Sequence, residues 1–205
     1  MLVKVCGMRD PDNIRAVEAS GADWMGFIFY ERSPRFVSSP PAYLPESVKR
    51  VGVFVNSPYE YILRQGDNMK LDIIQLHGNE TPQMCRRLQE KGYKIIKSFS
   101  LENVNDLQKT GPYTTCCDYF LFDTPCSSYG GSGKKFNWDL LAEYQGEIPF
   151  ILSGGLNPDS LDDLKQFNHP RWAGIDLNSG FETSPALKDI KTLKTFIKNF
   201  KTSAL

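Results

Sequence analysis

The 205-residue chain is poor in metal-binding residues, with only two histidines, His77 and His169, and no cysteine pair spaced as CxxC. Zinc sites draw Cys and His ligands from short, regular spacings, so the sequence predicts no zinc site. Its five cysteines are an odd number, and no apolar signal-peptide stretch precedes them. We therefore expect reduced thiols rather than a disulfide framework, and a cytoplasmic location.

The chain also lacks an excess of charge and long hydrophobic runs. Lys+Arg and Asp+Glu both number 24, which leaves a formal net charge of zero. Nucleic-acid binding needs a basic excess to neutralise phosphates, so we expect no nucleic-acid partner. Apolar runs such as 24–30 are far shorter than the ~20 residues that cross a bilayer, so we expect no membrane partner. A hydrophobic content of 40% excludes disorder as the main character of the chain.

Short apolar runs alternate with amphipathic stretches along the whole sequence, and no linker divides it. Asp10-Pro11, Thr81-Pro82 and Asn157-Pro158 are typical helix starts, because the first residue caps and proline suits the first turn. This alternation is what a parallel sheet with helical crossovers requires. The predicted strands are residues 1–6, 24–29, 50–55, 71–76, 94–99, 119–123, 149–152 and 173–177.

Eight strand–helix units predict an α/β fold, a single (β/α)8 TIM barrel domain over residues 1–205. An open, doubly wound sheet can be written from the same units. The count of eight favours the closed barrel, as do polar loops after many strands rather than at one crevice. Between the second and third strands we expect a helix at 42–49, and we expect the last helix at 187–200.

Glycine-rich segments follow the last three predicted strands, at 130–133 (GGSG), 153–155 (SGG) and 178–180 (NSG). Barrel active sites lie at the carboxyl ends of the strands, and backbone N–H groups of glycine loops there bind phosphate. A single glycine pair would indicate only a turn. Three such loops together favour a phosphorylated small-molecule ligand.

Four side chains at predicted strand ends or in nearby loops could carry chemistry. Cys6 and Asp123 are a workable base and acid, although a cysteine is often only a small buried hydrophobe and an aspartate a capping group. Arg35 could bind a carboxylate or phosphate through two parallel hydrogen bonds, or be a solvated surface residue. His77 could be a second base or a hydrogen-bonded structural group.

Seven segments near these strand ends carry longer motifs. They are KVCGMRD (4–10), GFIFYERSPRFVS (26–38), VGVFVN (51–56), IQLHGNE (74–80), LFDTPCSSYGGSGKKFNW (121–138), LSGGLNPDS (152–160) and GIDLNSGFETSPALKD (174–189). Together and in this order they closely resemble the phosphoribosylanthranilate isomerase family, over essentially the whole chain.

The resemblance implies an isomerase of tryptophan biosynthesis that needs no metal or organic cofactor. It would convert N-(5-phosphoribosyl)anthranilate into 1-(2-carboxyphenylamino)-1-deoxyribulose 5-phosphate by an Amadori rearrangement. Cys6 matches the family's general base, Asp123 its general acid and Arg35 the residue that pairs with the anthranilate carboxylate. The other substrate-binding residues that we carry over are His77, Asp176, the loop residues Gly130, Gly131, Ser132 and Gly133, and the phosphate-binding residues Gly154, Gly155, Ser179 and Gly180.

This chemistry needs both groups in their less usual protonation states. Asp123 would donate a proton to the ribose ring oxygen, and Cys6, as thiolate, would remove the C2′ proton. Because a free Asp has a pKa of about 3.9 and a free Cys of about 8.5, we expect the site to raise the first and lower the second. Arg9 and Arg35 are the candidate cations for Cys6. Asn178 departs from the small residue usual in the family, and Cys126 adds a thiol near the site.

Two other classes of phosphate-binding barrel compete with this interpretation. A metal-dependent pentose-phosphate epimerase needs paired histidines, which His77 and His169 cannot supply. An indole-glycerol-phosphate synthase needs a catalytic lysine at an early strand end, whereas Lys4 lies deeper in its strand than Cys6. A binding protein without activity would not need to keep Cys6 and Asp123. The sequence leaves open whether the protein is a monomer or a homodimer.

Overall fold

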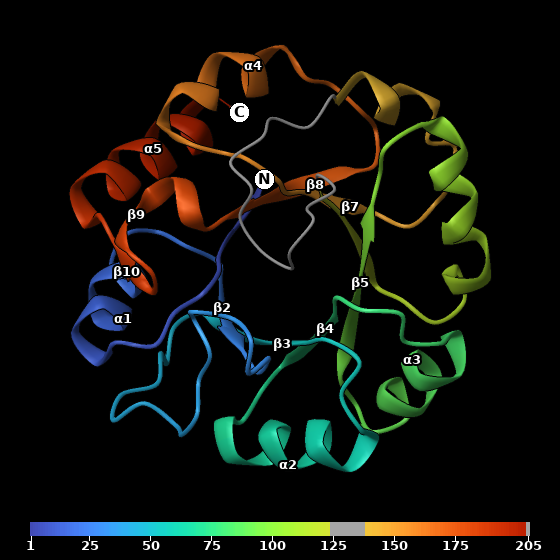
Figure 1. The fold of residues 1–205 in the computed structure, drawn as a ribbon. Coiled ribbons are helices and arrows are strands. Elements are labelled where there is room, and N and C mark those ends of the chain that lie inside the picture. The colour runs from blue at the N-terminus through green and yellow to red at the C-terminus, as the bar shows by residue number, and fades with distance from the viewer. Residues whose placement is uncertain (124–137, 204–205) are drawn as a thin grey trace.

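The computed structural model describes residues 1–123 and 138–203, and its eight parallel strands close into a barrel (Figure 1). Each strand pairs with the next in the chain, and β8 returns to pair with β1. The expected (β/α)8 barrel is therefore confirmed. The strands are β1 (Leu2–Val5), β2 (Trp24–Ile28), β3 (Lys49–Phe54), β4 (Ile73–Leu76), β5 (Lys94–Ser100), β6 (Tyr119–Asp123), β7 (Phe150–Leu152) and β8 (Trp172–Leu177).

Helices surround the barrel, and several begin at the caps that the sequence predicts. The side chains of Asp10, Thr81 and Asn157 each accept a hydrogen bond from a backbone N–H in the first turn of their helix. None of the helices in the described part is long and apolar enough to cross a membrane. They are α1 (Pro11–Glu18), α2 (Tyr59–Met69), α3 (Pro82–Gln89), α4 (Leu161–Gln166) and α5 (Ile190–Ser203), with 3-10 turns η1 (Val104–Tyr113), η2 (Trp138–Glu143), η3 (Pro158–Ser160) and η4 (Ser179–Phe181).

The helix expected at 42–49 is wrong, because this connection is an irregular loop. Prolines at 40, 41 and 45 supply no backbone N–H and disfavour helical geometry in the residues before them. The carboxylate of Glu18 instead accepts hydrogen bonds from the backbone N–H groups of Glu46 (2.7 Å) and Ser47 (2.6 Å). A side chain from α1 therefore satisfies backbone groups that a helix would have paired.

The start of the last helix also differs from the expectation. Leu187 and Lys188 form the short strand β10 (Leu187–Lys188), which pairs in antiparallel fashion with β9 (Glu182–Ser184). The helix α5 begins only at Ile190. This hairpin matters for the site because it turns the Lys188 side chain inward, where it is almost completely buried.

The interior of the barrel is apolar at the amino-terminal ends of the strands and polar at their carboxyl ends. Alternate residues of a strand share a face, so Val51 lies on the same side as Val53, and Ile73 on the same side as Gln75. The amino-terminal half is closed by an apolar plug of six buried residues, and polar side chains follow toward the carboxyl ends. The plug consists of Trp24, Val51, Ile73, Ile96, Leu121 and Ile151.

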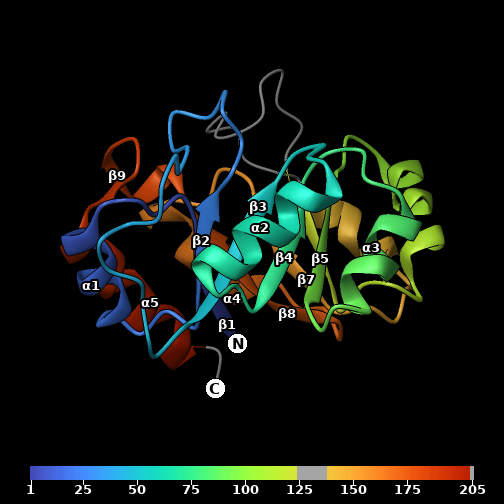
Figure 2. The same cartoon turned by 90° about the horizontal axis from the view of Figure 1, so that it is seen from below.

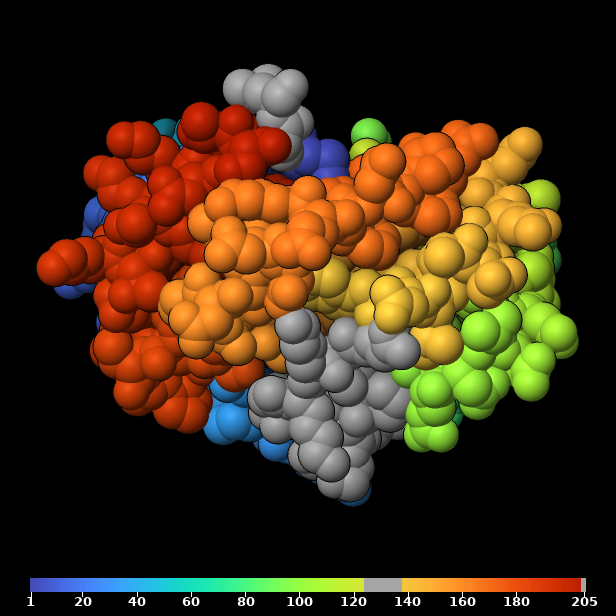
Figure 3. Space-filling model, turned by 90° about the horizontal axis from the view of Figure 1, so that it is seen from above, coloured from blue at the N-terminus to red at the C-terminus, as the bar shows by residue number. Residues whose placement is uncertain are grey.

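A second cluster of buried apolar residues packs between the strands and the helices around them. Helices α4 and α5 lie next to each other, in orange and red (Figure 1 and Figure 3). The N-terminus and the end of α5 lie at the side of the barrel opposite the long loop after β2 (Figure 2).

Candidate active site

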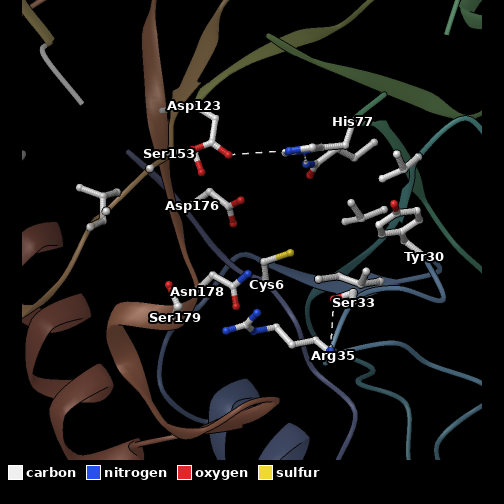
Figure 4. Close-up of a pocket in the computed structure, with 17 residues that line it drawn as sticks. Cys6, Tyr30, Ser33, Arg35, His77, Asp123, Ser153, Asp176, Asn178 and Ser179 are labelled. Atoms are coloured by element: carbon white, nitrogen blue, oxygen red, sulfur yellow. Dashed lines mark hydrogen bonds and ion pairs between the residues drawn. The ribbon is translucent and has the colours of Figure 1, made fainter. Parts of the chain in front are cut away.

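A pocket opens at the carboxyl ends of the strands, above the apolar plug (Figure 4). It brings together side chains from β1, β4, β6, β7 and β8 and from the loop after β2. Of the residues carried over from the family, Cys6, Arg35, His77, Asp123, Gly154, Gly155, Asp176 and Ser179 line it, and Gly130, Gly131, Ser132 and Gly133 lie outside the described residues. The other lining residues are Ile28, Tyr30, Ser33, Val53, Val55, Gln75, Ser153, Leu156 and Asn178.

Cys6 follows β1 directly, and its backbone N–H donates to the carbonyl of Leu177 at 2.8 Å, which extends the pairing with β8. Its side chain points into the pocket and the residue is only 4% exposed. Two residues earlier, the Nζ of Lys4 lies 2.9 Å from Oδ1 of Asp176. This ion pair is almost completely buried, and its Asp176 carboxylate lines the pocket together with Cys6.

The charges around Cys6 differ from the expectation. Burial raises the pKa of the thiol, and Asp176 raises it further, while the ammonium groups of Lys4 and Lys188 lower it. The net direction of the Cys6 pKa is upward, so the predicted lowering is wrong. Arg9 instead donates to the carbonyl oxygen of Phe36 at 3.3 Å, and its side chain is exposed. The cations that act on the thiol are thus lysines from β1 and β10.

Asp123 ends β6, and its Oδ2 faces Nε2 of His77 at 3.7 Å (Figure 4). Burial, together with the charges of Lys97 and Lys4, lowers the pKa of His77 to about 4, so this imidazole is neutral at pH 7. The amide nitrogen of Gln75 lies 3.0 Å from Nδ1 of the same ring. If the amide donates, the ring proton resides on Nε2 and points at the Asp123 carboxyl group.

The neutral state of His77 predicts a pH-dependent stability. The unfolded chain binds this proton below pH ~6.5 and the folded chain only below about 4, so stability is lost as pH falls through that window. The loss is roughly 3 kcal/mol in the wild type at pH 4. Urea unfolding from pH 4 to 7 should show this slope, and His77→Asn should flatten it. Parallel curves for the two proteins would contradict the prediction.

Arg35 is held at the edge of the pocket by an acidic partner that the sequence analysis did not single out. Its Nη2 lies 2.6 Å and its Nε 2.9 Å from the two carboxylate oxygens of Glu182. Lys188 binds the same carboxylate at 2.7 Å and also the side-chain oxygen of Asn178 at 2.9 Å. Because Glu182 fixes two of its donors, the guanidinium is pre-oriented at the pocket wall.

The loops after β7 and β8 have the backbone geometry of an anion site. Gly154 and Gly155 adopt φ values of +87° and +68°, which favour glycine and allow successive N–H groups to line a concave surface. A Cβ on Gly180 would lie 2.2 Å from the carbonyl oxygen of Leu156, so only glycine permits the two loops to meet. Gly180 does not line the pocket itself, and its contribution is this close approach.

Among the polar residues at or beside the pocket that were not predicted as site residues are Lys4, Gln75, Glu182 and Lys188. Two of them carried a detectable signal. Lys4 and Gln75 stand two residues before Cys6 and His77 in otherwise apolar strands, so the period of two predicts that they share the inward face. No sequence pattern indicates that Glu182 and Lys188 belong to the site. The hairpin that carries them falls in a segment for which the sequence predicts a loop and a helix.

The positions of the two histidines and of Lys4 test the two alternative enzyme classes, the metal-dependent epimerase and the synthase with a catalytic lysine. His77 lines the pocket, whereas Nε2 of His169 lies 3.0 Å from the carbonyl oxygen of Tyr144, away from it. The two histidines therefore do not form a pair. Lys4 is bound to Asp176 below the pocket and does not line it.

The fold and the site together define a TIM barrel whose pocket holds a thiol, a carboxyl group and a guanidinium beside glycine-rich loops. The model of the family N-(5′-phosphoribosyl)anthranilate isomerase matches residues 3–199 of the chain. The N-(5′-phosphoribosyl)anthranilate isomerase of Phocaeicola vulgatus is 59% identical over 201 residues, 98% of each chain, and that of Parabacteroides distasonis is 52% identical over 97% of this chain and 92% of the relative.

Solved structures agree with these relatives. A crystal structure of a phosphoribosylanthranilate isomerase in complex with reduced 1-(o-carboxyphenylamino)-1-deoxyribulose 5-phosphate is 34% identical, with a TM-score of 0.84 over 98% of this chain and all of the other. The enzyme of Thermotoga maritima is 35% identical, with a TM-score of 0.83 over 98% and 99%. The chain belongs to the N-(5′-phosphoribosyl)anthranilate isomerase family, aldose–ketose isomerases of tryptophan biosynthesis.

Proposed function

We propose that Cys6 is the general base and Asp123 the general acid in the conversion of N-(5-phosphoribosyl)anthranilate to 1-(2-carboxyphenylamino)-1-deoxyribulose 5-phosphate. The observation that carries the proposal is their common pocket: the two side chains face it from β1 and β6 (Figure 4). Asp123 donates a proton to the ribose ring oxygen, the ring C1′–O bond breaks, and the anilino nitrogen supplies the electron pair for a C=N bond. The product of this step is an open-chain protonated Schiff base.

Cys6 then acts on the carbon next to the Schiff base. Its thiolate removes the C2′ proton, and the electron pair moves toward the cationic nitrogen to give an enolamine. The hydroxyl proton on C2′ is lost as a proton is added to C1′, which yields the ketone. Substrate and product are isomers, so no oxidant or reductant is consumed.

A cationic substrate intermediate would favour the Cys6 thiolate. Burial holds the pKa of the Cys6 thiol above its usual value. The positive nitrogen of the Schiff base would add to the attraction from Lys4 and Lys188 and stabilise the thiolate. Neutral His77, with a proton on Nε2, would stabilise the Asp123 carboxylate formed by the first step.

The rest of the pocket suits the two ends of this substrate. Gly154, Gly155 and Ser179 are assigned to the phosphate, with Gly180 keeping their loops together. Arg35 is assigned to the anthranilate carboxylate, and Asp176 acts indirectly by holding Lys4 under the thiol. The glycine-rich loop Gly130, Gly131, Ser132 and Gly133 is assigned to the substrate on the family resemblance alone.

The experiment that tests this mechanism is the reaction in D2O. Because a proton abstracted by a thiol can exchange with solvent, the product should carry deuterium at C1′, detected by NMR. The same reaction in H2O with substrate deuterated at C2′ should lose part of the label to water. If Cys6→Ala incorporated deuterium at C1′ at the wild-type rate, a group other than Cys6 would be the base.

Replacing Arg35 with alanine should raise KM by about 10- to 100-fold with a smaller change in kcat. The reason is the lost charge-assisted pairing with the substrate carboxylate, which contributes about 1.5–3 kcal/mol. Arg35→Lys, the matched control, keeps the charge but not the planar fork and should recover only part of the affinity. Steady-state kinetics measures both. An unchanged KM in Arg35→Ala would remove Arg35 from the substrate site.

We also propose that residues 1–205 act as one domain, in the cytoplasm, as a monomer or homodimer. A solved relative from Thermotoga maritima is described as dimeric, and monomers generated from it have also been solved. Both states are therefore compatible with this fold. Sedimentation equilibrium of the full chain distinguishes them.

A further inference from the structure

Three cysteines gather outside the active site, between α3 and the segment that leads into β6. Cys85 lies on the buried face of α3, and Cys116 and Cys117 lie in the bend that precedes β6. Their three sulfur atoms all lie within 4.8 Å of one another. Cys85 and Cys116 have no exposed surface, and Cys117 is 6% exposed. The proposed isomerisation uses none of these thiols.

Backbone contacts hold the two segments that carry the thiols. The N–H of Cys116 donates to the carbonyl of Tyr113 at 3.1 Å, which forms the bend. Next to it, Oδ2 of Asp118 accepts the N–H of Ile95 at 2.8 Å and anchors the bend to β5. The hydroxyl of Tyr113 donates to the carbonyl of Glu80 at 2.8 Å, just before α3. These contacts fix the two segments that bring the three thiols together.

Positive charge faces the cluster from two sides. The Lys97 ammonium acts on Cys85 and Cys117, and the Arg86 guanidinium acts on Cys116. Glu80 lies 3.4 Å from the Lys97 nitrogen, but its carboxylate also accepts the backbone N–H groups of Asn56 (2.7 Å) and Gly78 (3.0 Å). Glu80 therefore competes with the thiol groups for the charge of Lys97.

We propose that Cys85, Cys116 and Cys117 form a binding site for a soft monovalent cation, Cu(I), coordinated by three thiolates. Sulfur donors select soft ions such as Cu(I) over hard ions. Sulfur atoms about 2.3 Å from one metal in a trigonal arrangement lie about 4 Å apart, so the cluster needs to contract by less than about 1 Å. The step is simple ligand exchange: three S–Cu bonds form and the thiol protons leave to solvent.

The number of sulfur ligands in the cluster favours Cu(I) over Zn²⁺. Structural zinc sites are closed by four protein ligands. In the part of the chain that the structure describes, no other His, Cys, Asp or Glu joins the three sulfur atoms. The burial of Cys85 and Cys116 also leaves little access for a water molecule as the fourth ligand. Three-coordinate binding suits Cu(I), which forms stable trigonal thiolate complexes.

The test is an anaerobic titration of the reduced full chain with Cu(I) against a competing chelator, bathocuproine disulfonate. The wild type should bind one Cu(I) per chain, and X-ray absorption should show a first shell of three sulfur atoms. Cys117→Ala should weaken binding by at least about 100-fold, since it removes a ligand rather than an outer-shell partner. The matched control, Cys6→Ala, removes a buried thiol that is not part of the cluster and should retain full binding.

Several outcomes would overturn the proposal. They are absence of Cu(I) binding in competition, loss of binding in Cys6→Ala but not in Cys117→Ala, and a four-ligand shell with Zn²⁺ bound as tightly as Cu(I). Circular dichroism verifies the fold of each variant, and Cys116→Ala provides a second ligand deletion if Cys117→Ala does not fold. Isomerase activity is not the readout, so failure of the copper site leaves the proposed function untouched.

Discussion

Replacing Cys6 with alanine should lower kcat by about 10²–10⁴-fold while KM changes little. The substitution removes the only atom assigned to take the C2′ proton and leaves the phosphate and carboxylate contacts in place. The residue is 4% exposed and small, so the fold should tolerate its loss. Steady-state kinetics with the phosphoribosylated substrate measures both constants.

Two comparisons sharpen this result. Cys6→Ser keeps a group of similar size whose hydroxyl is a far weaker acid than a thiol, so it should be nearly as inactive as Cys6→Ala. Cys116→Ala removes an equally buried thiol that does not line the pocket and should leave kcat within about twofold. A Cys6→Ala enzyme with half the wild-type rate would show that another group is the base.

Replacing Asp123 with asparagine should lower kcat by a similar factor, about 10²–10⁴-fold. The amide keeps the shape of the side chain and can still donate a hydrogen bond, but it cannot transfer a proton to the ring oxygen. The matched control is Asp118→Asn, at the residue just before β6. Its Oδ2 accepts the N–H of Ile95 at 2.8 Å, outside the pocket, so the control should lose stability while retaining kcat.

The pH–rate profile separates the two roles. A reaction that needs Cys6 as thiolate and Asp123 as acid gives a bell-shaped profile, rising as the thiol ionises and falling as the acid is lost. Asp123→Asn should abolish the fall at high pH and leave a low activity that increases with pH. If Asp123→Asn kept the wild-type kcat, the ring oxygen would be protonated by another group.

The sequence predicted the fold because the local patterns agree with the final pairing. Each apolar run became a strand within a few residues, and Asp10 and Thr81 cap helices as their chemistry suggests. The period of two in β1 and β4 also places Cys6 and His77 on the inward face. Cys6 and Asp123 could therefore be placed in one pocket from strand order and strand ends alone.

The errors come from contacts between distant parts of the chain. The carboxylate of Glu18 binds the loop at Glu46 and Ser47, and this partner is invisible to any pattern within 42–49. In the same way, Lys188 reaches Glu182 and Asn178 only because a hairpin forms before α5. A local pattern cannot show which cation meets which anion once the chain has folded.

The pKa of Cys6 shows most clearly that a property of the site can depend on contacts between distant residues. From the sequence, arginines were the natural partners, since Arg9 and Arg35 lie close in the motifs. In the structure Arg35 is paired with Glu182, and two lysines act on the thiol against a larger effect of burial. The direction of the pKa depends on this balance and on Asp176, which only the three-dimensional arrangement reveals.

The measurement that tests the central claim most directly is a fluorescence assay on the purified protein. Phosphoribosylanthranilate is generated in place from anthranilate and phosphoribosyl pyrophosphate, the protein is added, and the loss of anthranilate-type emission is followed. The account predicts rapid loss in the presence of a metal chelator, and its disappearance in Cys6→Ala. No loss with a folded protein that still binds a phosphate analogue would contradict the proposed reaction and point to a different sugar phosphate.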